Sequence, residues 1–414
     1  MKASRTTIFW IHLVLGCVAG LVILTMSVTG VLLAFQRQIN AMADAPAVLQ
    51  GQLDSAPPQP LDLTLATLES NGQGTPSELV LHNAPNAPVE ARFGRERTLY
   101  LNPWTGEIIG QPSERTRAFF TVIERFHRSL GLGMQSAFGR DITGAANLAF
   151  LFMLVSGLYL WLPKLFNLTS LKTRLAFRRG LQGKAREWNW HHAVGIWTAI
   201  PLLFIVVTGV IISYPLASNL LYKATGTQPP ANGFRNDRGP SAGDPNRAAS
   251  HGQRAAEHAR YRALNDLAQI AKLQIPAWKS ITIGVPQPQA PTLGVSIDKS
   301  IGGQPEQASQ LVINRTSGHV DAVRSFSDNN AGRKLRAWAR FLHTGEEFGV
   351  VGELIAAISC LGAIVLVWTG LAMAIRRALA FSKRPQVEGA SASSVNRSGA
   401  SADQSACPTN TPSF

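Results

Sequence analysis

Long stretches without a charged residue divide this chain into alternating apolar and polar segments. The four uncharged intervals each hold at least 22 residues, rich in Leu, Ile, Val, Phe, Ala and Gly, and cover 6–36, 142–163, 188–222 and 354–375. About 20 apolar residues span a bilayer as a helix. The pattern therefore predicts four transmembrane helices, roughly at 8–35, 142–163, 190–214 and 351–375. A buried helix of a soluble protein is the alternative for any single interval, and four such intervals argue against it.

The first apolar stretch also has features of a cleavable signal peptide. Lys2 and Arg5 precede it, and Ala41-Met42-Ala43 resembles a cleavage site. The apolar core of a signal peptide has only about 7–15 residues, and this stretch is much longer. We therefore expect it to remain in the protein as a membrane anchor.

The polar segments 36–141 and 215–345 each predict a small α+β domain from alternating apolar positions and turn residues. The first has a predicted helix near 61–70 and strands near 78–82, 90–94 and 97–109. The second has a predicted helix near 255–272 and strands near 279–284, 292–298 and 310–324. Gly, Pro, Asn and Ser are frequent in 225–253, which predicts a flexible loop, and the Ser/Ala-rich tail 385–414 predicts disorder.

The charges sort to the two sides of the four predicted helices. The chain has 39 Lys and Arg, 25 Asp and Glu, and a net charge of +14. Segments 36–141 and 215–353 together carry only +3, whereas the remaining segments, including the basic loop 164–189, carry +11. The positive-inside rule places the basic segments in the cytoplasm. We expect a multi-pass protein of the bacterial inner membrane with both termini cytoplasmic, and no nucleic-acid binding.

The two halves of the chain resemble each other. His12, Gly16 and Thr29-Gly30 recur as His191, Gly195 and Thr208-Gly209 at a constant offset. Both polar segments contain a strand, an Asn/Gly turn and a second strand, at 99–108 and 311–320. These correspondences predict two parallel repeats of helix, outer domain and helix.

Histidines occupy matching positions in the two predicted repeats. His12, His191 and His192 begin helices at the cytoplasmic edge, whereas His127 and His343 precede helices at the outer edge. Neutral imidazole binds haem iron axially, and ligands on different helices can hold one macrocycle in a bundle core. Glycines such as Gly16, Gly20 and Gly195 would admit a flat ring, although they also suit helix packing.

This pattern predicts two haem sites, an inner one and an outer one. His12 and His191 would serve the inner site, with His192 as the alternative to His191, because successive helical residues point about 100° apart. His127 and His343 would serve the outer site. Zinc is a weaker interpretation, because the pairs lack Cys or carboxylate partners at metal-site spacing. No C-x-x-C-H sequence occurs, which excludes that type of covalent haem attachment.

Sequence motifs of other enzyme classes do not occur. The chain has no G-x-S-x-G, no H-E-x-x-H, no P-loop and no G-x-G-x-x-G after a strand. Electrons would then come from a separate cytoplasmic flavoprotein or from membrane quinol. No catalytic residue beyond the haem ligands is assigned.

The chain resembles the PepSY-associated transmembrane helix family over about residues 8–378. The matching segments are Trp10-Ile11-His12 through Thr29-Gly30, Phe126-His127 into Gly157-Leu158-Tyr159, Trp190-His191-His192 through Thr208-Gly209, and Phe341-Leu342-His343 through Thr369-Gly370. The resemblance implies an α-helical membrane protein with four transmembrane helices and α+β PepSY-like periplasmic domains.

Members of this family include inner-membrane siderophore reductases with two haem b groups. The resemblance therefore implies a ferric-siderophore reductase, which passes electrons from the cytoplasmic side to a ferric siderophore in the periplasm. Reduction would release the iron, because siderophore oxygens prefer Fe(III) to Fe(II). The alternative function is a non-catalytic PepSY scaffold or regulator that binds a protein partner. A transporter is weaker, because the helices lack carboxylates for ion coupling.

Overall fold

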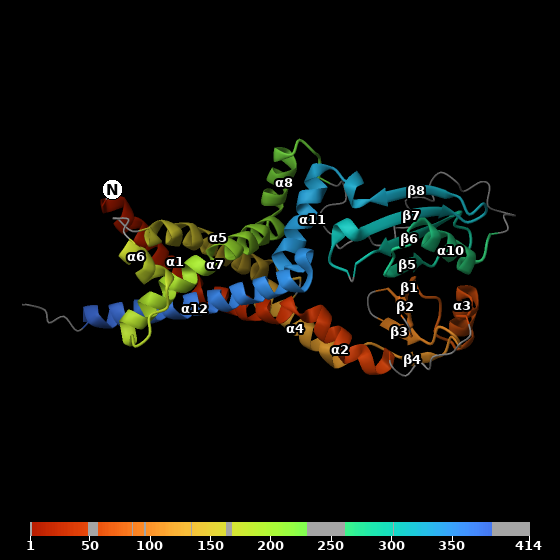
Figure 1. Cartoon of the computed structure of the whole chain (residues 1–414), viewed down its shortest axis with the longest axis horizontal. Helices are drawn as coiled ribbons and strands as arrows, with labels where there is room; N and C mark the ends of the chain where they lie inside the picture. The colour runs from red at the N-terminus through yellow and green to blue at the C-terminus, as the bar shows by residue number, and fades with distance from the viewer. Residues whose placement is uncertain are drawn as a thin grey trace, which may run out of the picture.

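The computed structural model describes residues 2–48, 57–84, 86–94, 97–133, 135–162, 168–229, 261–300 and 302–382. Figure 1 shows a bundle of long helices joined at one end to a β-sheet. The predicted flexible loop 225–253 lies outside the described residues from position 230 onward, and so does the predicted disordered tail 385–414.

Within the described residues, four helices are long and apolar enough to cross a membrane, as the charge-free intervals predicted. They are α1 (Lys2–Ala34), α5 (Ala137–Trp161), α7 (Gly183–Ser213) and α12 (Gly349–Ser382). Each packs against two of the others in the cyclic order α1, α5, α7, α12, so that α1 and α7 lie diagonally. The start of α1 and the end of α12 both lie at the end of the bundle away from the sheet (Figure 1).

Shorter helices cover the two ends of the bundle. They are α2 (Gln36–Val48), α4 (Glu114–Ser129), α6 (Leu168–Leu175), α8 (Pro215–Ala224) and α11 (Ala331–Thr344), with the one-turn helix η5 (Glu346–Phe348) before α12. α4 packs on α1 and α5, and α11 packs on α7 and α12. The Ser113 and Asn330 side chains accept backbone amides at the starts of α4 and α11, which satisfies amides that a helix start leaves without partners.

The strands form a single eight-stranded antiparallel sheet in the order β4-β3-β2-β1-β5-β6-β7-β8. From the first polar segment come β1 (Glu78–His82), β2 (Val89–Phe93), β3 (Arg97–Leu101) and β4 (Ile108–Gly110). From the second come β5 (Ser280–Gly284), β6 (Thr292–Asp298), β7 (Ala308–Asn314) and β8 (Val320–Ser325), with one-turn helices η3 (Pro305–Gln307) and η4 (Phe326–Asp328). The segments that the sequence predicted as two domains are joined by β1 and β5, where Val80 pairs with Thr282.

Two helices, α3 (Leu61–Ser70) and α10 (Leu264–Gln274), share one hydrophobic core with the sheet. Leu68 and Leu267 are fully buried there against strand residues such as Ile283. α10 begins at position 264, later than the predicted 255, and residues 261–263 are not helical. The Asp62 carboxylate on α3 accepts the Leu264 and Asn265 amides, so the cap that starts α10 comes from a distant segment.

The sheet is fastened to the bundle by polar contacts of α2. The Asp44 carboxylate accepts hydrogen bonds from the Tyr100 hydroxyl of β3, at 2.9 Å, and from the Arg117 guanidinium of α4. The Arg37 guanidinium donates to the Gly302 carbonyl in the β6–β7 connection at 2.7 Å. The sheet therefore has fixed contacts with α2 and, through Asp44, with α4, which carries His127.

Candidate functional site

The two predicted outer histidines come together between the short helices and the bundle. His127 lies near the end of α4 and His343 near the end of α11, and their imidazole centroids are 6.3 Å apart with ring planes at 63°. Leu130 and Gly345 end these helices in left-handed conformation. The chain turns back there into α5 and α12, which places each histidine against the bundle.

The ring of His127 is oriented by Thr29 of α1. The distance from His127 Nδ1 to Thr29 Oγ1 is 2.9 Å. The Thr29 hydroxyl lies 2.7 Å from the Thr25 carbonyl, to which it donates its own proton. Since a hydroxyl has one proton, Thr29 must accept from His127 Nδ1–H. The other nitrogen, Nε2, is then the lone-pair nitrogen that can bind a metal.

The same assignment follows for His343 from a backbone acceptor. His343 Nδ1 lies 2.8 Å from the Ile205 carbonyl of α7 and 3.4 Å from Thr208 Oγ1. A carbonyl can only accept, so Nδ1 carries the proton. His343 Nε2 is likewise left without a proton.

Burial holds both outer imidazoles in the neutral form. Burial and the neighbouring His343 lower the pKa of His127 to about 4. Burial also lowers the pKa of His343. Neutral imidazole is the form that serves as a metal ligand.

The inner histidines repeat this arrangement on the long helices. His12 of α1 has its Nδ1 2.8 Å from Ser156 Oγ of α5, and His191 of α7 has its Nδ1 3.0 Å from Thr369 Oγ1 of α12. The Thr369 hydroxyl donates to the Val365 carbonyl at 2.7 Å, so His191 Nδ1 is the donor. His12 and His191 lie on the diagonal helices α1 and α7.

A glycine follows each of the four hydroxyl residues and lies against the same histidine. The pairs are Thr29-Gly30 with His127, Ser156-Gly157 with His12, Thr208-Gly209 with His343, and Thr369-Gly370 with His191. A Cβ on these glycines would lie between 3.1 and 3.6 Å from the Cε1 atom of the ring. Each transmembrane helix therefore provides one Ser/Thr-Gly contact for an imidazole.

The sequence contained these Ser/Thr-Gly pairs, but which histidine each pair contacts depends on how the helices are rotated about their axes. Thr29-Gly30, Thr208-Gly209 and Thr369-Gly370 were visible as a recurring dipeptide, whereas Ser156-Gly157 was missed. Gly16, Gly20 and Gly195, which the sequence suggested both for the ring and for helix packing, face Met153, Val367 and Leu366 at ordinary contact distance. These contacts fit helix packing.

His192 has different surroundings from the four. Its ring stacks on the Trp188 indole with centroids 4.0 Å apart, and its Nδ1 donates to the Trp188 carbonyl at 2.8 Å. It has no Ser/Thr-Gly partner among the contacts of the described residues. The geometry thus favours His191 as the inner ligand, and His192 stays the alternative.

Three side chains that sequence reasoning did not select lie together at the end of α5. The Arg5 guanidinium donates to the Leu160 carbonyl at 2.6 Å and the Arg174 guanidinium donates to the Trp161 carbonyl, both at the end of α5. The indole N–H of Trp161 is buried and has no hydrogen-bond partner among the described residues. Arg5 precedes His12 by two helical turns, about 10 Å along one face of α1.

The described residues contain no group of three or more His, Cys, Asp or Glu side chains that could hold a metal ion. A structural zinc site usually takes four protein ligands, and a catalytic one takes three. Haem is different, because its porphyrin supplies four nitrogens and the protein supplies only the axial positions. Pairs of imidazoles therefore suit haem better than a bare ion.

Comparison with known proteins identifies the family. No curated protein matches the chain at a significant level. The family model described as the PepSY-associated TM region matches residues 9–377, which include all four spanning helices, the sheet and the five histidines discussed above. The chain therefore belongs to the family of the PepSY-associated TM region.

Proposed function

We propose that this chain is a di-haem b membrane reductase that passes electrons from the cytoplasmic side to a periplasmic ferric siderophore. The observation that carries the proposal is the arrangement of His12, His127, His191 and His343. All four have Nδ1 hydrogen-bonded to a partner on another helix. Such a contact fixes the tautomer and orients the ring of a metal-binding histidine.

The separation of the outer pair supports an iron between them. An imidazole nitrogen binds a metal at about 2 Å, so an iron midway between two Nε2 atoms would place the ring centroids about 6 Å apart. The His127 and His343 centroids are 6.3 Å apart. These two rings would be the axial ligands of the outer haem, and His12 and His191 those of the inner one.

The inner site also has groups that suit the propionates of a haem. Arg5 and Arg174 bring two positive charges to the end of α5, and the buried indole N–H of Trp161 has no partner within the described part of the chain. A buried donor without a partner costs free energy, which a carboxylate acceptor would recover. Arginine pairs readily with carboxylates. We assign these three residues to the propionates of the inner haem.

When bound, each haem supplies an iron that gains and loses one electron. The protein residues hold the rings, exclude water and separate two sites along the bundle. The outer pair lies at the end of the bundle that carries the sheet, and the basic segments lie at the other end (Figure 1). With the positive-inside rule, the sheet faces the periplasm and both termini face the cytoplasm. The electron donor would be a cytoplasmic flavoprotein or membrane quinol.

The test is the absorbance spectrum of the full chain purified in detergent from haem-replete cells. We expect a Soret band and, after dithionite, the α-band of a six-coordinate b-type haem, with two haems for each chain. Addition of a ferric siderophore should reoxidise the haem, with the ferrous product trapped by a chelator. A colourless preparation would refute the reductase and favour the PepSY scaffold. A red protein that no ferric siderophore reoxidises would refute the ferric siderophore as the electron acceptor.

A further inference from the structure

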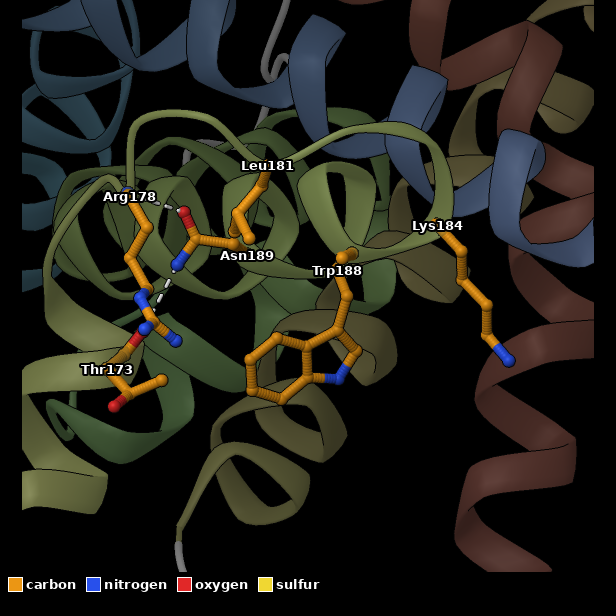
Figure 2. Close-up of a pocket in the computed structure, with 7 residues that line it drawn as sticks. Thr173, Arg178, Leu181, Lys184, Trp188 and Asn189 are labelled. Carbon is orange, nitrogen blue, oxygen red and sulfur yellow. Dashed lines mark hydrogen bonds between the residues drawn. The ribbon is translucent and has the colours of Figure 1, made fainter.

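A cavity of about 450 Å³ opens on the cytoplasmic end of the bundle, between α6 and the start of α7. Figure 2 shows the Trp188 indole at its centre, with the Arg178 side chain on one side and the Lys184 side chain on the other. Leu181 and Ala185 add apolar surface. The volume lies within the range of about 300–1,000 Å³ that small-molecule sites occupy.

A buried amide holds the walls of this cavity in place. Asn189 is 1% exposed. Its side chain accepts the Arg178 amide at 3.0 Å and donates to the Thr173 and Ala176 carbonyls at 3.1 and 3.0 Å. The connection after α6 is thereby fixed to α7. The backbone around the cavity is therefore held in place, and the exposed side chains of Arg178, Lys184, Ala185 and Trp188 line it.

The chemistry of the lining selects a ligand with an aromatic and an anionic part. Trp188 is partly exposed and presents an aromatic surface. Arg178 and Lys184 supply two positive charges, and no acidic residue lines the cavity. The start of α7 adds to this field, because Gln182 makes no side-chain capping bond to the first amides and helix N-termini attract anions.

The cavity adjoins the inner histidines. The Trp188 indole stacks on His192 at 4.0 Å between centroids, and His192 lies 6.3 Å from His191. Trp188 therefore belongs both to the cavity and to a chain of aromatic rings that ends at the proposed inner ligand.

We propose that this cavity binds a phosphorylated flavin of the flavin mononucleotide type, which serves as the electron donor. The isoalloxazine ring stacks on Trp188 and lies beside Arg178, and the phosphate is held on the opposite side by Lys184 and the start of α7. The role of the flavin as electron donor rests on the proposed function, whereas flavin binding rests on the cavity alone. Membrane quinol lacks the anionic part, and a phospholipid lacks the aromatic part.

The electron balance is straightforward. A reduced flavin releases two electrons and two protons when it is oxidised. The electrons leave one at a time for the inner haem iron and reduce two ferric ions at the outer end, and the protons go to cytoplasmic water. No other reactant is needed.

Binding is tested with flavin mononucleotide itself, by quenching of its fluorescence on titration with the full chain in detergent. We expect Trp188→Leu to weaken binding about tenfold, the usual effect of losing an aromatic stacking partner. Arg178→Gln with Lys184→Gln should weaken it about tenfold or more through loss of charge-assisted hydrogen bonds. Arg179→Gln removes the same charge from the neighbouring residue, which does not line the cavity, and should have no effect.

Riboflavin, which lacks the phosphate, should bind the wild type about as weakly as flavin mononucleotide binds the double variant. Equal affinity for flavin mononucleotide in wild type and Trp188→Leu would overturn the site. Failure of flavin to bind, with Trp188 fluorescence instead responding to nanodiscs of phosphatidylglycerol against phosphatidylcholine, would assign the cavity to lipid.

The donor role has a separate readout. Reduced flavin mononucleotide should reduce the haem of the wild type faster than that of Trp188→Leu, while dithionite reduces both to the same spectrum. Equal rates would overturn the donor role. A colourless protein that still binds flavin would refute the haem assignment and leave the flavin site standing, so the two failures are distinguishable.

Discussion

His127 and His343 face each other with centroids 6.3 Å apart, although they come from different halves of the chain. Through its hydrogen bond to Thr29, His127 contacts α1, and through its hydrogen bond to Ile205, His343 contacts α7. The pair therefore meets between the two diagonal helices of the bundle. The helices α1 and α7 also carry the inner histidines, which contact α5 and α12, so the four rings connect all four spanning helices.

Replacement of either outer histidine should remove one of the two proposed haems. His127 and His343 would each supply one axial ligand of the outer haem. His127→Ala or His343→Ala should therefore reduce the haem content by about half. The measurement is the haem-to-protein ratio from the pyridine haemochrome spectrum of purified protein. His319→Ala is the control, because that ring is an exposed side chain at the sheet. Equal haem content in all variants would contradict the outer site.

The hydroxyl that orients His127 can be tested without touching the ligand. Thr29→Val keeps the shape of the side chain but removes the hydroxyl that accepts from the buried His127 Nδ1–H, whose other partner is the Met26 carbonyl. Loss of such an outer-shell partner usually lowers metal affinity by about 10- to 100-fold. A haem titration of protein made without haem would measure this, and Thr29→Ser should restore binding.

A matched control lies one turn earlier on the same helix. The Thr25 hydroxyl donates to the Leu21 carbonyl on an exposed part of α1. Thr25→Val therefore removes the same group without changing a histidine. If Thr25→Val and Thr29→Val lowered the affinity equally, the effect would belong to helix stability and not to the ring.

The sequence predicted elements well and their mutual contacts poorly, for a physical reason. A long stretch without charged residues indicates a membrane helix, and alternating apolar and polar residues indicate a strand. Both patterns are local, so the sequence shows them directly. The pairing of β1 with β5 and the contact of His12 with Ser156 depend on how distant segments rotate and meet. The helices α4 and α11 were not predicted, although the apolar residues of each follow a single face, which is the pattern of an amphipathic helix.

Two glycines of α7 should respond in opposite ways to the same substitution. A Cβ at Gly209 would lie 2.9 Å from Asn147 Nδ2 and 3.1 Å from His343 Cε1. Gly209→Ala should therefore displace His343, destabilise the protein by about 1–3 kcal/mol and lower the outer haem content. A Cβ at Gly195 would meet Leu366 at an ordinary 3.5 Å. Gly195→Ala should be neutral or stabilising, because alanine favours helix. The Tm values of the two variants and of the wild type, measured by thermal unfolding in detergent, check this difference.

The contact between Asp44 and the sheet should be lost in acid. Burial opposes ionisation of Asp44, but the Arg117, Ser113 and Tyr100 hydrogen bonds outweigh it and hold its pKa below the ordinary 3.8. The stabilisation is therefore complete above pH 3.8 and is lost as the pH falls through the lowered value. At pH 7, Asp44→Asn should destabilise the protein by about 2 kcal/mol, and the difference in Tm from wild type should shrink below pH 4. Asp321→Asn removes a carboxylate from an exposed pair and should change neither the stability at pH 7 nor its dependence on pH. A constant difference at all pH values would show that the carboxylate charge is not what matters.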